Sequence, residues 1–89
     1  MARAQRDQRP GRRGRRATDR KDPELVEFGR RLRELRDAAG LTQEDLADAA
    51  GLHWTYVGQI ERGERNLTYK NILRLARGLD VQPGALIGP

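Results

Sequence analysis

The N-terminal segment is the most chemically distinctive part of the chain. Residues 1–23 hold nine of the 18 basic side chains against three aspartates, whereas residues 24–89 hold nine basic and ten acidic side chains. Arginine density of this kind gives sequence-independent, salt-sensitive affinity for phosphate-rich polymers. The formal charge of +5 therefore resides entirely in this segment and predicts a polyanionic partner.

Several other kinds of chemistry are excluded by composition. The chain has no cysteine and a single histidine, His53, so it can form no disulfide, thiolate zinc site or cysteine nucleophile. It also contains no recognisable nucleophile–base pair, paired carboxylates in a cleft or phosphate-binding glycine loop. A chain of 89 residues is also too short for a two-layer enzyme with a deep pocket. We therefore expect no catalytic residue, no metal and no cofactor.

Hydrophobic periodicity divides the chain into two parts. Residues 1–22 have none, which predicts a disordered, arginine-rich arm, whereas residues 23–89 carry helical spacing throughout and form the predicted folded domain. Helices are expected to begin after Asp22, near Thr42, at Trp54, after Thr68 and near Pro83. Their expected inner faces are Phe28, Leu32, Leu35 and Ala39; Leu46, Ala47 and Ala50; Val57 and Ile60; and Ile72, Leu75, Ala76 and Leu79.

The helix boundaries have recognisable capping residues. Asp22 precedes Pro23, a favoured first helical residue, and Thr42 with Asp45 fits a capping box. Glycines at 40, 51 and 63 follow the first three helices and fit left-handed ends. With no strand signal, the prediction is a compact all-α domain of five short helices.

Residues 41–68, LTQEDLADAAGLHWTYVGQIERGERNLT, contain two short helices joined by a tight turn. Ala47 is small enough for the helices to approach, and Gly51 can take the positive φ angle of the turn. The segment resembles the Cro/Xre, phage-repressor-like helix-turn-helix family through Thr42-Gln43, Leu46-Ala47, Gly51, Val57, Ile60-Glu61 and Gly63. The run WTYVGQIERGERNLT is also similar to the small controller regulators of restriction–modification systems.

This resemblance implies a lambda-repressor-like fold over residues 26–87 that binds double-stranded DNA, with the helix-turn-helix proper at about 42–62. The helix from Trp54 to about Arg62 would lie in the major groove. Gln43 would lie near a phosphate, and Gln59 could pair with adenine or guanine. The full set of expected DNA contacts is Gln43, Trp54, Thr55, Tyr56, Gln59, Arg62, Arg65, Asn66, Thr68 and Lys70.

Three positions near the start of this helix need separate expectations. Trp54 replaces the polar residue common in the family, and we expect its indole to be exposed rather than part of the core. Tyr56 is expected to be largely packed, with its hydroxyl reaching a phosphate at most. His53 is expected to act as a solvated helix cap rather than as a ligand or catalytic group.

The resemblance also pairs Arg36 with Glu61 in a partly buried salt bridge between the first and third helices. Its expected role is to fix helix orientation, so that loss of one partner would destabilise the domain without altering sequence preference.

The function of the arm has three interpretations: an inert tail, a nonspecific phosphate binder or a segment that enters the minor groove. Nonspecific binding is the preferred one, and its expected contacts are Arg12, Arg13, Arg15, Arg16 and Arg20. The arm could also bind RNA. An alternative for the whole chain is an antitoxin that binds a toxin or other protein partner and regulates its own operon.

A single recognition helix reads few base pairs, so we expect a homodimer on a palindromic operator. The candidate interface is the C-terminal segment around Val81, Leu86 and Ile87, whose apolar residues exceed what a short terminal turn can bury. No apolar stretch approaches the length needed to cross a bilayer, and the N-terminal arginines are not followed by a hydrophobic region. The expected location is therefore the cytoplasm, in association with the nucleoid when DNA is bound. Whether the effect is repression or activation depends on promoter geometry.

Overall fold

The computed structural model describes residues 22–88. Within that range the chain forms five helices and no strand: α2 (Pro23–Ala38), α3 (Gln43–Ala50), α4 (Trp54–Glu61), α5 (Tyr69–Leu79) and α6 (Gly84–Ile87). The all-α prediction is thereby confirmed. The predicted arm, with Arg12, Arg13, Arg15, Arg16 and Arg20, lies outside the described residues apart from its last residue, Asp22. Among the described helices, none combines the length and the apolar character needed to cross a bilayer.

Side-chain caps begin the longer helices where the sequence predicts them. Asp22 accepts a hydrogen bond from the backbone N–H two residues on, at 2.9 Å. Thr42 and Asp45 exchange two hydrogen bonds of 3.0 Å, each side chain accepting from the other's backbone N–H. Thr68 Oγ1 accepts from the Asn71 backbone N–H at 3.1 Å. Each cap satisfies a backbone donor that a helix leaves without an internal partner.

One helix end differs from the glycine pattern. Gly40 and Gly63 have φ angles of 73° and 76° as expected, but α5 ends at Asp80, whose φ is 59°. Aspartate tolerates this left-handed conformation better than most side chains because its short polar group bonds locally. The structure therefore makes a turn at Asp80 that a search for glycine does not find.

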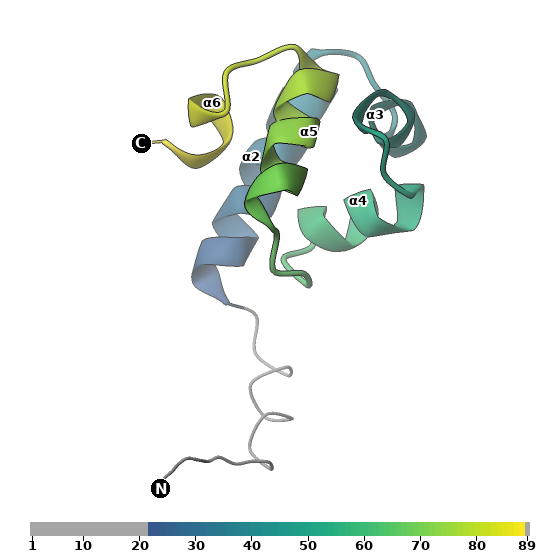
Figure 1. Cartoon of the computed structure of the whole chain (residues 1–89). Helices are drawn as coiled ribbons and strands as arrows, with labels where there is room; N and C mark the ends of the chain where they lie inside the picture. The colour runs from purple at the N-terminus through teal and green to yellow at the C-terminus, as the bar shows by residue number, and fades with distance from the viewer. Residues whose placement is uncertain (1–21, 89) are drawn as a thin grey trace, which may run out of the picture.

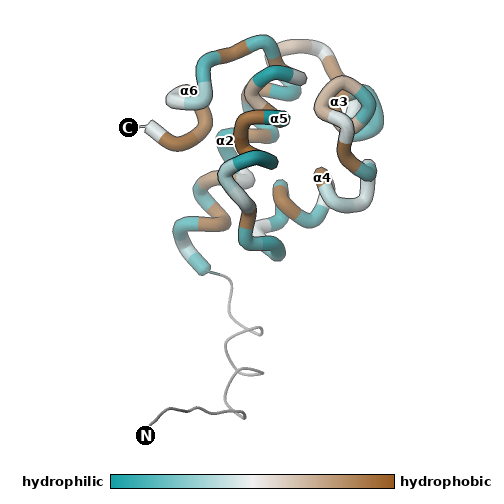
Figure 2. The backbone as a smooth tube through the Cα atoms, viewed as in Figure 1, coloured by the Kyte–Doolittle hydropathy of each residue, from teal (hydrophilic) through white to brown (hydrophobic). Residues whose placement is uncertain are grey.

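The core lies between α2, α3, α4 and α5, and α6 closes one end. Its buried residues are Phe28, Leu32, Leu46, Ala47, Ala50, Val57, Ile60, Leu75, Ala76, Leu79 and Leu86. Brown and teal segments alternate along α2 and α5 in Figure 2, as expected of helices with one buried face. The prediction for Ala39 was wrong, because Ala39 follows the last residue of α2 and is exposed. Leu35 and Ile72 are partly buried and pack against the core.

The helices lie in two groups around α2 and α5. Figure 1 shows α3 and α4 on one side of this central pair and α6 on the other. α6 is tied to α2 because Arg31 donates a hydrogen bond to the Gly88 carbonyl. Leu86 is only 1% exposed, and Val81 packs against the core. The expectation that these two residues exceed what the terminal turn can bury was therefore wrong, whereas Ile87 is exposed.

Candidate nucleic-acid interface

The turn between α3 and α4 sets the angle at which α4 is presented. Gly51 ends α3 with a φ of 72°, and the Leu52 N–H donates to the Ala47 carbonyl at 2.9 Å. A hydrogen bond that closes a turn of six residues in this way is typical of the Schellman motif at the C-terminus of a helix. Ala47 is buried and Leu52 packs against the core. The chain thus leaves α3 sharply and enters α4 only three residues after Gly51.

α4 has one buried face and one outward face. Val57 and Ile60 are 0% and 1% exposed, whereas Trp54 is 49% exposed. Thr55 is also exposed and Gln59 is half-buried. The outward face therefore carries an indole, a hydroxyl and an amide. The structure agrees with the expected exposure of Trp54, whose ring stacks on His53 with a centroid distance of 6.1 Å.

His53 caps α4 and also holds the side chain of Thr55. Its Nδ1 accepts from the Thr55 backbone N–H at 3.2 Å, and Thr55 Oγ1 lies 2.7 Å from the same nitrogen. A ring nitrogen that accepts from the backbone carries no proton, so the Thr55 hydroxyl must donate to it. The hydroxyl can therefore act toward the outside only as an acceptor, through its oxygen lone pairs, and the exposed side chain also carries a methyl group.

A buried polar network lies behind α4. Arg36 Nε donates to Glu61 Oε2 at 2.6 Å, and Arg36 Nη2 donates to Oε1 at 3.1 Å. The Gln43 amide donates to the same Oε1 at 3.0 Å, and Arg36 Nη1 donates to the Leu41 carbonyl at 2.8 Å. The Arg36 and Glu61 side chains are 11% and 4% exposed. The hydrogen bond to Glu61 raises the pKa of Arg36 above its usual value, against the opposing effect of burial.

Because these bonds join α2, α3 and α4, the network fixes α4 relative to the other two helices. One carboxylate is held by two side chains from two different helices, so its position is over-determined. The bond to Glu61 holds the Gln43 side chain in place, and the Gln43 amide retains one N–H that no described residue accepts. Arg36, Thr42, Gln43, Glu44 and Trp54 line an open groove between the N-terminal ends of α3 and α4.

The loop after α4 and the start of α5 contribute further predicted contacts. The Arg65 guanidinium carbon lies 5.3 Å from the centroid of the Tyr56 ring. Arg62 pairs with Glu64 at 3.1 Å, so its charge is partly neutralised. Asn66 and Lys70 are exposed, while the Thr68 hydroxyl is used to cap α5.

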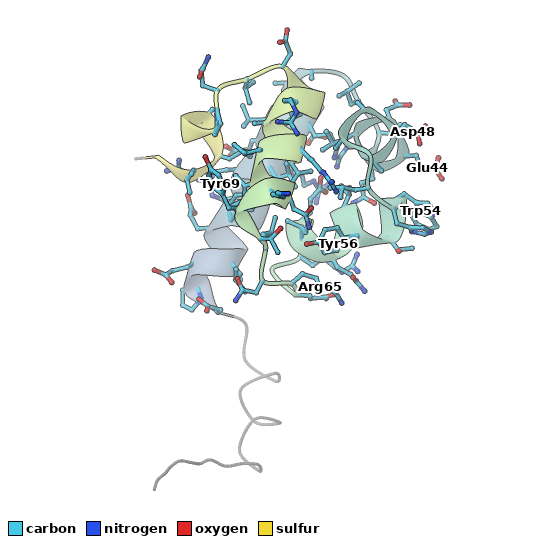
Figure 3. All side chains as sticks on the ribbon, in the orientation of Figure 1. Glu44, Asp48, Trp54, Tyr56, Arg65 and Tyr69 are labelled. Atoms are coloured by element: carbon cyan, nitrogen blue, oxygen red, sulfur yellow. The ribbon has the colours of Figure 1, made fainter. Side chains whose placement is uncertain are left out.

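Figure 3 shows where three of the predicted contacts lie. Trp54, Tyr56 and Arg65 lie along the α4 side, and Tyr69 lies on the far side of α5. Glu44 and Asp48 are on the outer side of α3, near Trp54. Tyr56 is partly buried and packs against the core, as expected. The face is therefore of mixed charge, and its basic groups lie toward the loop after α4.

Comparison with known proteins identifies the family. A family model described as a helix-turn-helix domain matches residues 27–87. The chain belongs to the helix-turn-helix family. Control protein C.BamHI of Bacillus amyloliquefaciens is 41% identical over 61 residues, which is 67% of this chain and 75% of that protein. Control protein C.SmaI of Serratia marcescens is 41% identical over 56 residues, covering 63% of this chain and 67% of that protein.

Solved structures agree with this assignment. The restriction-modification controller protein C.AhdI from Aeromonas hydrophila is 55% identical, with a TM-score of 0.72 over 73% of this chain and 98% of that one. The wild-type controller C.Esp1396I is 37% identical, with a TM-score of 0.67 over 70% and 80% of the two chains. Structures of C.Esp1396I also exist for variants at a consecutive arginine, threonine and tyrosine, and at a second arginine nine residues beyond the tyrosine.

Two residues that position this helix-turn-helix were missed from the sequence. A Cβ on Gly29 would lie 2.4 Å from the Ile60 carbonyl oxygen, so α2 and α4 approach through backbone contact at this point. A glycine inside a helix costs about 1 kcal/mol relative to alanine, and that cost could have flagged Gly29. Asn71, on the first turn of α5, donates to the Tyr56 hydroxyl at 3.0 Å. Nothing in its sequence context indicates this bond, since the partner is 15 residues away.

Proposed function

We propose that this chain is a sequence-specific, double-stranded DNA-binding transcriptional regulator that inserts α4 into the major groove. One observation carries the proposal. α4 turns Trp54 and Thr55 outward, while the buried Arg36–Glu61 pair fixes the helix from behind. A rigid helix with exposed hydrogen-bonding side chains is what direct readout requires. The role is binding rather than catalysis.

The outward residues of α4 supply distinct base contacts. Gln59 can bond bidentately to adenine N6 and N7. Thr55 offers a methyl group for thymine and a lone pair for a donor, since its proton is committed to His53. Trp54 offers apolar surface for a thymine methyl or a sugar. We therefore expect the half-site to be read mainly through A·T pairs.

The spacing of the studied positions in C.Esp1396I supports this assignment. Thr55 and Tyr56 are consecutive here, and Arg65 follows nine residues later, which matches the threonine, tyrosine and second arginine of that protein. Trp54 occupies the place of the first arginine. This chain would thus have an indole where that protein has an arginine, a side chain able to bond bidentately to guanine, and a different operator is expected.

Phosphate contacts would surround the base-reading residues. Gln43, at the start of α3, has an amide N–H that no described residue accepts, and Lys70 with the first amides of α5 forms a second donor group. Arg62 and Asn66 flank them in the loop. The arm would add nonspecific affinity through Arg12, Arg13, Arg15, Arg16 and Arg20.

The regulator would act as a homodimer through its C-terminal side. Ile87 is 58% exposed, and a groove between α2 and α6 is lined by Pro23, Phe28 and Leu86 among others. This surface lies away from α4 (Figure 1), so pairing would leave both recognition helices free. Analytical ultracentrifugation should detect a dimer, and Ile87→Arg should shift it to monomer. A monomer both free and on DNA would contradict this part of the proposal.

The antitoxin alternative has less support. The relatives described above are named as control proteins rather than antitoxins, and their lengths are covered largely by this one domain. A regulator of this kind would work in the cytoplasm, on the nucleoid.

Selection of bound duplexes from a random pool, at near-physiological salt, tests the proposal. Enrichment of a short inverted repeat is expected. Failure to enrich any sequence, with binding that disappears as salt rises, would leave only charge attraction and refute sequence-specific regulation.

A matched pair of variants then tests the role of α4. Gln59→Ala should weaken binding to the selected site by about 5- to 150-fold, the range for one bidentate base contact. Gln82→Ala, an exposed glutamine in the α5–α6 connection, should bind as the wild type does. Equal affinities of the two variants for the selected site would show that Gln59 makes no base contact.

A further inference from the structure

Three segments of the chain meet at the Tyr56 side chain. The ring belongs to α4, the Arg65 guanidinium from the following loop lies 5.3 Å from its centroid, and Asn71 from α5 donates to its hydroxyl at 3.0 Å. α5 packs mainly against α3. The bond from Asn71 to Tyr56 connects α5 directly to α4 as well. Tyr56 is therefore held at both its ring and its hydroxyl.

The direction of the Asn71 bond decides what the hydroxyl can do next. A phenol has one proton and two oxygen lone pairs. Since the oxygen accepts from Asn71 Nδ2, the proton stays available to a second partner. Asn71 itself is held in place because its backbone N–H donates to the Thr68 side chain at 3.1 Å. The hydroxyl thus keeps its proton for a second acceptor beside the first turn of α5.

We infer that Asn71 is a positioning residue of the DNA interface, which orients the Tyr56 hydroxyl to donate to a hydrogen-bond acceptor on the DNA. The inference rests on the proposed function and adds Asn71 to the predicted contacts. The acceptor is a phosphate oxygen or a base acceptor such as guanine O6 or thymine O4. Arg65, lying over the same ring, brings a positive charge to the same acceptor.

A double-mutant cycle on the selected duplex tests this inference. The full-length wild type, Asn71→Ala, Tyr56→Phe and the double variant are compared by fluorescence anisotropy at one salt concentration. Asn71→Ala should weaken binding roughly 2- to 10-fold, the equivalent of one hydrogen bond. In the Tyr56→Phe background the same substitution should have no further effect, because the hydroxyl through which Asn71 acts is absent.

A purely structural role for Asn71 gives a different pattern. Equal weakening by Asn71→Ala in both backgrounds, or no weakening in either, overturns the inference. Thermal unfolding of all four proteins identifies any variant that is destabilised. If Asn71→Ala alone is destabilised, the comparison of Tyr56→Phe with the double variant still shows whether Asn71 acts through the Tyr56 hydroxyl. If the wild type selects no sequence at all, it is the proposed function that fails, and the two failures are therefore distinguishable.

The same variants distinguish the two sources of the acceptor. Duplex selection is repeated with Asn71→Ala. An unchanged preferred sequence, bound uniformly more weakly, assigns the acceptor to phosphate, whereas a relaxed preference at one position assigns it to a base. Either result supports the donating hydroxyl.

Discussion

Replacing Arg36 by methionine should destabilise the domain more than any other change at a charged residue of the described part of the chain. The substitution keeps the apolar stem and removes the guanidinium. Among the described residues, Glu61, whose side chain is 4% exposed, would then keep only the Gln43 amide as a partner, and the Leu41 carbonyl would lose the Arg36 donor. A buried carboxylate without its cation is the costly state in this perturbation.

The size of the effect follows from burial. Removing one partner of a buried ion pair costs about 3–5 kcal/mol. Residues 22–88 should have a free energy of unfolding of about 3–10 kcal/mol, at roughly 0.05–0.15 kcal/mol per residue. The loss is therefore between about a third and the whole of the stability of the domain. Arg36→Met should unfold at a much lower urea concentration than the wild type.

Urea denaturation followed by far-ultraviolet circular dichroism measures this loss, and two further variants serve as controls. Arg33→Met removes an exposed arginine of the same helix, which lies 3.8 Å from Asp37, and should cost less than about 0.5 kcal/mol. The double variant Arg36→Met, Glu61→Leu removes both buried charges and should recover most of the stability.

The outcomes separate burial from other causes. A loss below about 1 kcal/mol for Arg36→Met, or a double variant as unstable as the single one, would refute the reasoning from the unpaired buried charge. The rescued double variant should also select the same DNA sequence as the wild type, because Arg36 and Glu61 hold α4 without touching bases.

Three further predictions concern helix packing, capping and the arm. Gly29→Ala should cost about 1–3 kcal/mol in urea denaturation, because its Cβ would lie 2.4 Å from the Ile60 carbonyl oxygen. Thr42→Ala should cost about 1 kcal/mol through loss of the α3 cap. The hydrogen bonds from Thr42 lower the pKa of the Asp45 carboxyl in the folded protein. The stability that these bonds contribute is therefore fully present above the pKa of Asp45 in the unfolded chain, about 4, and is lost as the pH falls through its lower pKa in the folded protein. Deleting residues 1–21 should lower DNA affinity and flatten its salt dependence with the preferred sequence unchanged.

Each of these predictions has a control or a contradicting result. Gly84→Ala, where a Cβ meets nothing within 4 Å, should leave packing undisturbed, and equal losses at both glycines would contradict the contact argument. Asp45→Asn should differ most from the wild type near neutral pH, and a gap that widens in acid would have the wrong sign. A changed base preference after deletion of the arm would indicate groove reading rather than phosphate binding.

Local sequence signals determined the helices and their starts. Asp22, Thr42 and Thr68 cap helices as predicted because a capping side chain bonds to backbone two or three residues away. The 3.6-residue spacing likewise located the core residues of α3 and α4. The predicted domain boundary and the role of the arm stay predictions, since residues 1–21 lie outside the described part of the chain.

Resemblance supplied what local rules could not. The pairing of Arg36 with Glu61 joins residues 25 positions apart, and no local spacing rule links them. The family pattern indicated the pair, but it did not indicate that Gln43 shares the same carboxylate.

The tertiary structure alone decided which side chains meet across helices. The backbone contact at Gly29, the bond from Asn71 to Tyr56 and the burial of Leu86 all depend on how helices far apart in sequence pack together. Hydrophobic spacing states which face of a helix is buried, but it does not state which neighbour covers that face. The sequence by itself therefore determined a helix-turn-helix with an outward α4, and only packing determined how α4 is held and which residues orient its side chains.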